Sequence, residues 1–173
     1  MLLALALHAF LFAAPPPAVT PDAAVAKILD GWHAAAAAAD EPRYFAHFAA
    51  NGVFLGTDAT ERWTTEEFRR FAHPYFAKGK AWRFHARDRH VAFSPDGSVA
   101  WFDEALDTPN LGPARGSGVL VRSGPDWKIV QYNLSIPIPN DLTSEFKARI
   151  GESLLRPRTP APAPSPSPSP PPH

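Results

Sequence analysis

The sequence of 173 residues contains no cysteine, and this absence removes a group of functions. Disulfide bonds, thiol nucleophiles and cysteine-ligated metals all need the thiol side chain. Runs of basic residues are also missing, and 17 Lys and Arg residues balance 17 Asp and Glu residues to a formal net charge of zero. Because a nucleic-acid-binding surface must neutralise a phosphate backbone, we expect no nucleic-acid partner.

No apolar run reaches the roughly 20 residues that a membrane-spanning helix needs, so we expect no membrane span. Met1–Ala14 is apolar except for His8 and has the length of the apolar core of a secretory signal. We therefore expect residues 1–19 to be a signal peptide and the protein to be exported, either periplasmic or secreted. An N-terminal tail or a wrong start codon is the alternative. Residues 156–173 alternate proline with alanine and serine, which predicts a disordered tail.

The middle segment, residues 20–155, has the length of one domain. Helical spacing predicts a helix over residues 22–39, a short one that starts at Pro42 and buries Tyr44, Phe45 and Phe48, and a third over residues 64–78. Thr64 and Glu67 have the spacing of a capping box at the start of the third helix, and Pro74 predicts a bend or break in it.

A spacing of two takes over after Lys80 and predicts four strands, over residues 82–93, 99–106, 115–122 and 127–136. Turn signals at 94–97 and 123–126 indicate antiparallel hairpins, and residues 142–155 suit a closing helix. Helices followed by an antiparallel meander indicate the α+β class, with helices covering one sheet face. Gly116 and Gly118 mark a bend inside a strand, and a bent sheet under helices encloses a pocket for a small apolar molecule.

Two adjacent carboxylates, Asp103 and Glu104, stand inside the predicted strand "SVAWFDEALD". Successive side chains of a strand point to opposite faces, so one carboxylate is buried whichever face packs against the helices. A buried acid needs a hydrogen-bonding or cationic partner, or its pKa rises, and such acids cluster at functional sites. A structural acid with satisfied hydrogen bonds is the alternative. Both residues are candidate catalytic groups.

The hairpin turns suggest which residues share a face with each acid. A loop centred near Leu111 pairs Glu104 with Gly118, and a two-residue turn at Gly124 and Pro125 pairs Gly118 with Gln131. Glu104 then shares a face with Phe102, Trp127, Gln131 and Asn133. The opposite face, suited to a core or a dimer interface, carries Trp101, Asp103, Val119, Val121, Val130 and Tyr132. A register slip of one residue exchanges the two faces.

A polar loop, "GTDATERW", is placed to form the rim of a cavity, with Asp58 and Trp63 as candidate ligand-binding residues. Their ordinary alternative is an Asx turn at Asp58 and a helix-start contact at Trp63. Aromatic residues suited to core and cavity lining alike are Trp32, Phe54, Phe68 and Trp101. The predicted ligand-binding set is completed by Phe102, Gln131, Tyr132 and Asn133. The seven His residues show no tight ligand spacing, so we expect no metal.

The chain resembles the SnoaL-like members of the nuclear transport factor 2 and ketosteroid isomerase superfamily over about residues 24–146. The resemblance is carried in order by "LDGWHAAAAAAD", "VFLGTDATERWTTEEF", "PYFAKGK", "AWFDE", "RGSGVLVR" and "WKIVQYNLSIPIPND". It implies a cone-shaped α+β fold with a curved antiparallel sheet, N-terminal helices across its concave face, an apolar cavity and commonly a homodimer. Some members of this superfamily are isomerases, cyclases or dehydratases, and others only bind ligands or partners. The tyrosine and two aspartates of the isomerases have no residue-by-residue match here.

Three functions stay open at this point. The first is a cofactor-free domain that binds a small apolar molecule. The second is an enzyme of general acid/base type, with Glu104 or Asp103 as a base whose pKa is raised by a dry cavity, and with Gln131, Tyr132 or Asn133 as a polar partner. The third is a homodimeric assembly module that uses the outer sheet face.

Overall fold

The computed structural model describes residues 20–156, so the expected signal peptide and nearly all of the proline-rich segment lie outside the described residues. Four helices and six strands are present within this range. They are α1 (Pro21–Ala37), α2 (Glu41–Ala46), β1 (Phe48–Leu55), β2 (Arg62–Thr64), α3 (Thr65–Ala77), β3 (His85–Phe93), β4 (Val99–Thr108), β5 (Gly112–Ser123), β6 (Asp126–Ser135) and α4 (Thr143–Leu154), with a short 3₁₀ helix at Asn140–Leu142 before α4. No helix between residues 20 and 156 has the length and apolarity to cross a membrane.

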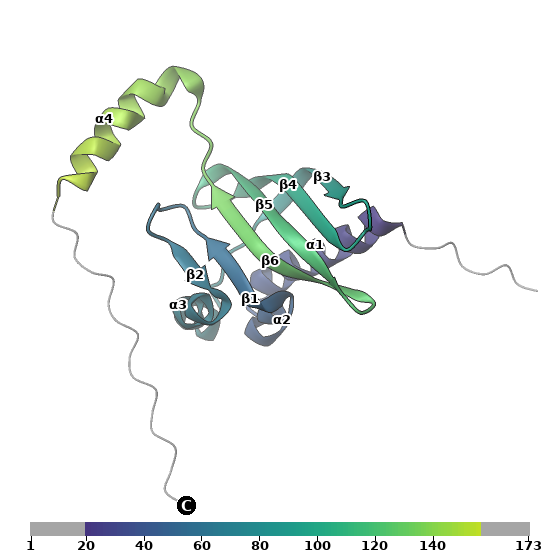
Figure 1. The fold of residues 1–173 in the computed structure, drawn as a ribbon. Coiled ribbons are helices and arrows are strands. Elements are labelled where there is room, and N and C mark those ends of the chain that lie inside the picture. Colours follow the sequence, from purple (N-terminus) through teal and green to yellow (C-terminus); the bar gives the residue numbers. More distant parts are fainter. Residues whose placement is uncertain (1–19, 157–173) are drawn as a thin grey trace, which may run out of the picture.

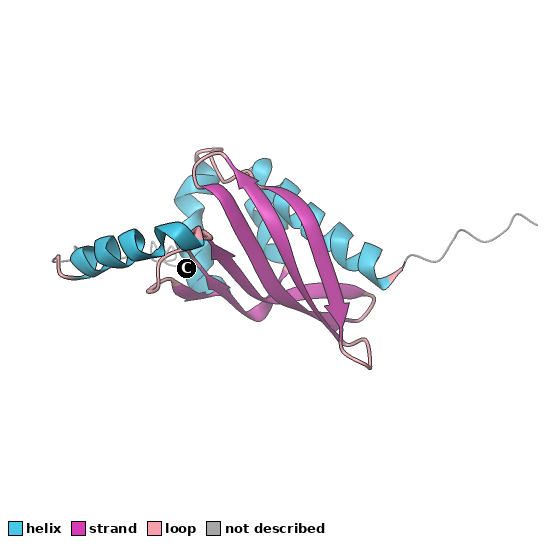
Figure 2. Ribbon diagram, turned by 90° about the horizontal axis from the view of Figure 1, so that it is seen from above, coloured by secondary structure: helices cyan, strands magenta, loops and turns pink. Residues whose placement is uncertain are grey.

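The strands form one curved sheet in the order β2-β1-β6-β5-β4-β3. Figures 1 and 2 show α1, α2 and α3 gathered on one side of this sheet, while α4 projects away from it. The prediction of an α+β fold with a curved sheet under N-terminal helices is therefore confirmed. One pairing was not expected: β1 runs parallel to β6, whereas all the other pairs are antiparallel.

Local sequence signals set the starts of the helices. The Thr20 hydroxyl accepts the Ala23 N–H at 3.3 Å, and Pro21 opens α1. Thr64 and Glu67 form the predicted capping box at the start of α3. The break expected at Pro74 is wrong, because α3 continues without interruption to Ala77. Proline lacks the N–H that would bond the preceding turn, and its exposed position lets water satisfy the freed carbonyl.

Strand boundaries differ from the prediction in two places. Phe48 begins β1 instead of ending the second helix, because α2 stops at Ala46 and the chain turns extended there. The strand predicted to start at Trp82 starts at His85, so Trp82 and Phe84 lie in the connection between α3 and β3. Both departures place aromatic side chains at the boundary between helices and sheet.

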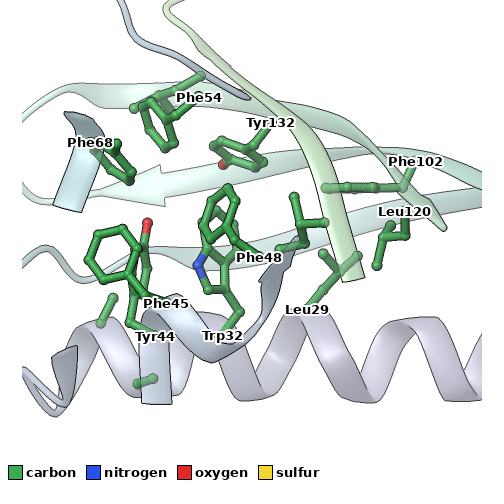
Figure 3. Close-up of a cluster of buried hydrophobic side chains, with 14 of the residues drawn as sticks. Leu29, Trp32, Tyr44, Phe45, Phe48, Phe54, Phe68, Phe102, Leu120 and Tyr132 are labelled. Atoms are coloured by element: carbon green, nitrogen blue, oxygen red, sulfur yellow. The ribbon is translucent and has the colours of Figure 1, made fainter. Parts of the chain in front are cut away.

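The core lies between the helices and the sheet and is rich in aromatic rings (Figure 3). Trp32 of α1 packs against Tyr44 of α2 and Tyr132 of β6, with ring centroids 5.2 and 4.6 Å apart. Phe54 of β1 stacks on Phe68 of α3 at 3.8 Å. These contacts pack the three helices against the sheet.

Candidate functional site

Of the two neighbouring acids in β4, Glu104 points inward and has no exposed surface. Asp103 points outward, where its carboxylate is exposed and lies 3.5 Å from His90 Nδ1. The prediction that one of the two is buried is confirmed, and the geometry favours Glu104 as the acid with access to the interior. Asp103 lies on the opposite sheet face from the helices.

Both oxygens of Glu104 accept a hydrogen bond from a different element. His33 Nε2 of α1 donates to one oxygen at 2.6 Å, and Arg89 Nε of β3 donates to the other at 2.7 Å. Arg89 also donates to Asp30 at 2.8 Å and to the Ala26 carbonyl at 3.2 Å. The acid therefore fastens α1 to β3 and β4 through charge-assisted hydrogen bonds.

The pKa of Glu104 moves in the direction opposite to the one expected for a catalytic base. Burial alone would raise it, but the hydrogen bond and charge of His33 together with those of Arg89 outweigh burial and lower the pKa below its usual value. The expectation of a raised pKa is wrong for this reason. The carboxylate is held ionised and is a weak base, which fits a structural or orienting role better than proton abstraction.

His33 and Arg89 were not among the predicted site residues. His33 is four residues after Leu29 on the buried stripe of α1, and this spacing is a signal that sequence reasoning had available. Arg89 faces inward because β3 has a bulge between Arg87 and His90, where Asp88 takes a positive φ of 47°. A bulge shifts the alternation of side chains by one residue, and no simple count of positions predicts it.

A second bulge changes which residues of β6 face the helices. Near the turn the predicted register holds, and Val121 pairs with Lys128. Between Leu120 and Val119 the pairing shifts by one residue, so that Val119 pairs with Gln131 and Gly118 with Tyr132. Tyr132 is consequently buried and Gln131 is exposed, the reverse of the predicted faces. Asn133 is half-buried on the same side as Gln131. The extra residue of the bulge is the physical cause of the exchange.

The glycines of β5 make room for interior side chains. Gly116, and not Gly118 as predicted, pairs with Glu104. A Cβ at Gly116 would lie 2.5 Å from the Tyr132 hydroxyl and 3.2 Å from a Glu104 oxygen, so the tyrosine and the acid meet over this residue. Gly118 pairs with Phe102 and lies under its ring. The expected close approach of side chains to a glycine opposite Glu104 is present, but at Gly116 instead of Gly118.

Four buried polar groups have no hydrogen-bond partner of good geometry within residues 20–156: the Tyr132 and Tyr44 hydroxyls, the Trp32 indole N–H and Nη2 of Arg89. Figure 3 shows Tyr132, Tyr44 and Trp32 between α1 and the sheet. The indole N–H groups of Trp32 and Trp82 face the Tyr44 hydroxyl closely enough to oppose the rise in its pKa that burial causes, so the Tyr132 hydroxyl and Arg89 Nη2 are the unpaired groups beside Glu104. Burial raises the pKa of both tyrosines well above the usual value, and the Glu104 charge adds to this at Tyr132. The hydroxyls therefore stay protonated and are available as donors.

A pocket of about 410 Å³, called here the mouth pocket, opens where α3, the connection after it and the β4–β5 turn meet. Six aromatic rings line it: Phe54, Trp63, Phe68, Phe71, Trp82 and Phe84. Leu111 and Leu134 add to its apolar wall, and Thr57, Glu61, Arg83 and Asn110 contribute polar groups. Neither His33 nor Glu104 lines this pocket. Phe84 lines the pocket, and its ring centroid lies 6.2 Å from that of His33.

The predicted ligand-binding residues separate into three groups. Phe54, Trp63 and Phe68 line the mouth pocket, whereas Trp32, Phe102 and Tyr132 lie in the core behind it. Trp101, Gln131 and Asn133 do not line the mouth pocket, and Trp101 is 49% exposed on the outer sheet face. Asp58 accepts hydrogen bonds from the N–H and hydroxyl of Thr60, as the Asx-turn alternative predicted. Within residues 20–156, no three His, Asp or Glu side chains form a metal-binding group.

Comparison with known proteins gives one family and several structural neighbours. The family model of the SnoaL-like domain matches residues 25–139. No protein of curated function matches the sequence. An NTF2-like protein of unknown function from Pseudomonas putida KT2440 superposes with a TM-score of 0.59 at 15% identity, covering 72% of this chain and 93% of that one.

Two further neighbours have functional suggestions attached. A suggested dehydratase of the NTF2-like family from Streptomyces avermitilis has a TM-score of 0.58 at 18% identity, covering 69% of this chain and all of that one. A suggested calcium/calmodulin dependent protein kinase II association domain from Xanthomonas campestris has a TM-score of 0.53 at 22% identity, covering 78% and 99%. Such different suggestions on one fold mean that the likeness establishes the fold alone.

Proposed function

Since this chain belongs to the family of SnoaL-like domains, we propose that it binds a small, largely apolar molecule in the mouth pocket. The observation that carries the proposal is the pocket of about 410 Å³ lined by six aromatic rings. Its size falls in the range of about 300–1,000 Å³ found for small-molecule sites. Phe71 is 44% exposed beside it, and such an exposed ring on a pocket wall is typical of a contact surface.

The wall and rim of the mouth pocket favour a flat ligand with one polar end. Trp63 stacks with both Phe68 and Phe71, with ring centroids 5.7 and 4.7 Å away, and this cluster presents aromatic surface to a ring or a conjugated system. Glu61 and Arg83 on the rim carry opposite charges, so a polar substituent at that end finds either a donor or an acceptor.

Binding of a neutral naphthylamine dye, followed by its fluorescence and by quenching of the tryptophans, tests the proposal. We expect Phe71→Ala to weaken dye binding by about fivefold or more, because it removes apolar contact area from the pocket. Tyr75→Ala is the matched control, since Tyr75 is similarly exposed on α3 but does not line the pocket. Equal effects of the two changes, or the absence of saturable binding, would overturn the proposal.

We infer a second candidate function, acid/base catalysis, from the unpaired polar groups beside Glu104. A buried polar group without a partner costs about 1–3 kcal/mol, so the Tyr132 hydroxyl and Arg89 Nη2 beside Glu104 indicate a site that a substrate oxygen can complete. In this proposal Glu104 orients His33, His33 exchanges the proton, and the Tyr132 hydroxyl donates to the substrate oxygen. Phe84 would have to move to connect this group with the mouth pocket.

The neighbour from Streptomyces avermitilis is a suggested dehydratase, and we propose dehydration of hydroxy-ketones as the first reaction to screen for this chain. For any substrate found, we expect Tyr132→Phe to lower kcat by about 100-fold with little change in dye binding at the mouth pocket. Turnover that Tyr132→Phe leaves intact, or no turnover across the screen, would remove this candidate.

We also propose that the outer sheet face forms a homodimer, because Trp101 is 49% exposed there beside partly exposed valines. Light scattering across a range of concentrations tests this proposal. A dimer that Trp101→Ser converts to a monomer supports it, and a monomer at every concentration rules it out.

A further inference from the structure

A second pocket, of about 280 Å³, lies between α1, α2 and the start of β6, and is called here the α2 pocket. It shares no lining residue with the mouth pocket. Arg43, His47 and Lys128 line it together with one carboxylate, Asp126. Ile28, Ala46 and Trp127 form the apolar part of its wall. Basic groups therefore come from two separate elements and converge on one small space.

Backbone hydrogen bonds hold two of the basic groups in place. His47 Nδ1 donates to the Arg43 carbonyl at 2.7 Å, which leaves Nε2 with its lone pair available. Lys128 Nζ donates to the Ala46 carbonyl at 2.6 Å and keeps two further N–H donors. The His47 carbonyl accepts the Ile129 N–H at 2.9 Å, which ties the end of α2 to β6. The pocket is thus assembled by the fold before any ligand arrives.

Gly31 gives these side chains their space on the α1 side. A Cβ there would lie 3.2 Å from His47 Nε2 and 3.9 Å from an Arg43 guanidinium nitrogen. Both groups therefore face the same point of α1. Gly31 interrupts a helix that is otherwise rich in alanine, where glycine costs about 1 kcal/mol relative to alanine. Because glycine is unfavourable inside a helix, its presence at residue 31 indicates that the space next to His47 and Arg43 is needed.

The charges in the α2 pocket are not balanced within it. Within residues 20–156, no ion pair closer than 4.0 Å involves Arg43, Lys128 or Asp126. Arg122 does not line the pocket; its guanidinium lies 4.8 Å from the centre of the Trp127 ring and donates to the Gly97 carbonyl. Burial lowers the pKa of His47, and the charges of Arg43 and Lys128 lower it further, while the backbone carbonyls of Arg43 and Tyr44 oppose this. The field at the imidazole is positive, and an anion would relieve it.

We propose that the α2 pocket binds a phosphate or phosphate monoester group. Arg43 and Lys128 donate to its oxygens, and His47 Nε2 accepts the hydroxyl proton of the singly protonated form. Arginine and lysine are the usual partners of phosphate, arginine by paired hydrogen bonds and lysine as a point charge. Ile28 and Trp127 leave an apolar wall for the organic part of a monoester. Asp126, the one carboxylate in the lining, disfavours fully ionised anions relative to protonated ones.

The test is titration of the full chain with inorganic phosphate and with phenyl phosphate at low ionic strength, followed by calorimetry and by the NMR signals of the His47 ring. We expect saturable binding below about 10 mM, with Arg43→Gln and Lys128→Gln each weakening it about fivefold or more. Arg70→Gln removes the same charge from an exposed site on α3 outside the pocket and should leave binding unchanged. Gly31→Ala should weaken binding by crowding His47 and Arg43.

Sulfate separates a built site from general attraction of anions, because it has the shape of phosphate but no proton to donate to His47 at neutral pH. We expect sulfate to bind several-fold more weakly and to shift the His47 signals less. Equal binding of sulfate, an equal effect of Arg70→Gln, or no saturation with either phosphate would overturn the proposal. Far-UV circular dichroism of each variant shows that it is folded. The result is therefore independent of whether dye binds at the mouth pocket.

Discussion

Glu104 keeps its charge without any exposed surface because each of its oxygens has its own donor. Removing one member of a buried ion pair costs more stability than replacing both members by apolar residues, since the remaining charge is left desolvated and unpaired. Arg89 retains Asp30 and the Ala26 carbonyl, but a glutamine at residue 104 offers one acceptor oxygen to the two donors, Arg89 Nε and His33 Nε2. The side chain therefore matters for stability whichever function the interior serves.

We expect Glu104→Gln to lower the free energy of unfolding by about 3–5 kcal/mol. Asp103→Asn is the matched control on the same strand, and because that carboxylate is exposed we expect a change within about 0.5 kcal/mol. Urea unfolding followed by far-UV circular dichroism measures both. A cost of Glu104→Gln no larger than that of Asp103→Asn would mean that the hydrogen bonds around Glu104 contribute little net stability.

The stabilisation from Glu104 should also depend on pH in a defined direction. Its pKa in the folded chain is below the value of 4.5 expected when unfolded, so its contribution is complete above pH 4.5 and is lost as the pH falls below it. Glu67 and Asp96 also have lowered pKa values, the latter about 2, so the wild type loses stability for other reasons too. The difference between wild type and Glu104→Gln isolates this residue and should shrink in acid by at most about 1.4 kcal/mol per pH unit.

Gly116 gives a second prediction at the scale of single residues. Gly116→Ala should destabilise the fold by about 1–3 kcal/mol, because the new methyl group would meet the Tyr132 hydroxyl at 2.5 Å. In a Tyr132→Phe background, which removes that hydroxyl, the cost should be clearly smaller. Gly151→Ala in α4, where no atom lies within 4 Å, should be neutral or slightly stabilising. Equal costs of Gly116→Ala in both backgrounds would show that the hydroxyl is not the obstacle.

The site was predictable only as far as side-chain alternation holds. Glu104 and Phe102 follow from period-two spacing on one uninterrupted strand, and both face inward. Tyr132 and Gln131 were exchanged, and Arg89 was missed, because each lies beyond a bulge that shifts the alternation by one residue. The prediction of Trp63 and Phe68 did not depend on strand register, because Trp63 was predicted from the polar loop before α3 and Phe68 from the helical spacing of α3.

The bulge in β3 is an element-scale device that turns Arg89 toward Glu104. Asp88 makes the bulge with a φ of 47°, a left-handed conformation that aspartate tolerates and β-branched residues resist. The contacts of Arg89 with Glu104 and with Asp30 of α1 thus depend on one short irregularity.

We expect Asp88→Val to destabilise the fold by about 1–2 kcal/mol, because valine is strained at positive φ. Asp88→Gly should be neutral or stabilising, since glycine takes this conformation without a steric cost. Thermal unfolding of both variants measures the difference. If the two substitutions have the same effect, the left-handed conformation at residue 88 is not what the position requires.

Elements with local signals were predicted well, and pairings between distant elements were not. The capping box of Thr64 and Glu67 located α3, and the two turn sequences located the hairpins, because these signals act within a few residues. The parallel contact of β1 with β6 joins Phe54 to Tyr132, and no short-range pattern reports on such a pair. The family resemblance implied a curved antiparallel sheet and did not give this parallel pairing either.

On the scale of the whole molecule, α4 stands apart from the domain. None of its residues is buried, and Leu142, Phe146, Ile150 and Leu154 are exposed along one side. Figure 1 shows the helix projecting from the end of β6. The apolar core and both pockets are complete before it begins.

We therefore expect a chain ending at Pro139 to unfold within about 0.5 kcal/mol of the full-length protein and to keep its dye binding. A chain ending at Ile129 is the contrasting case, because it loses the half of β6 that contains Tyr132 and pairs with β1, and we expect it not to fold. Denaturant unfolding of the two shortened proteins checks this. A large loss of stability at Pro139 would show that α4 contributes contacts to the domain.

The position of β6 bears on how this protein is made. The last strand to leave the ribosome, β6, lies between β1 and β5 in the sheet. The pair β2–β1 and the meander β3–β4–β5 therefore have no strand pairing with each other until β6 is synthesised. Nascent chains shorter than about residue 135 must carry both halves with open strand edges, which are prone to aggregate. Synthesis of this domain thus ends with the insertion of its central strand, and a chaperone that shields the two halves would act before that step.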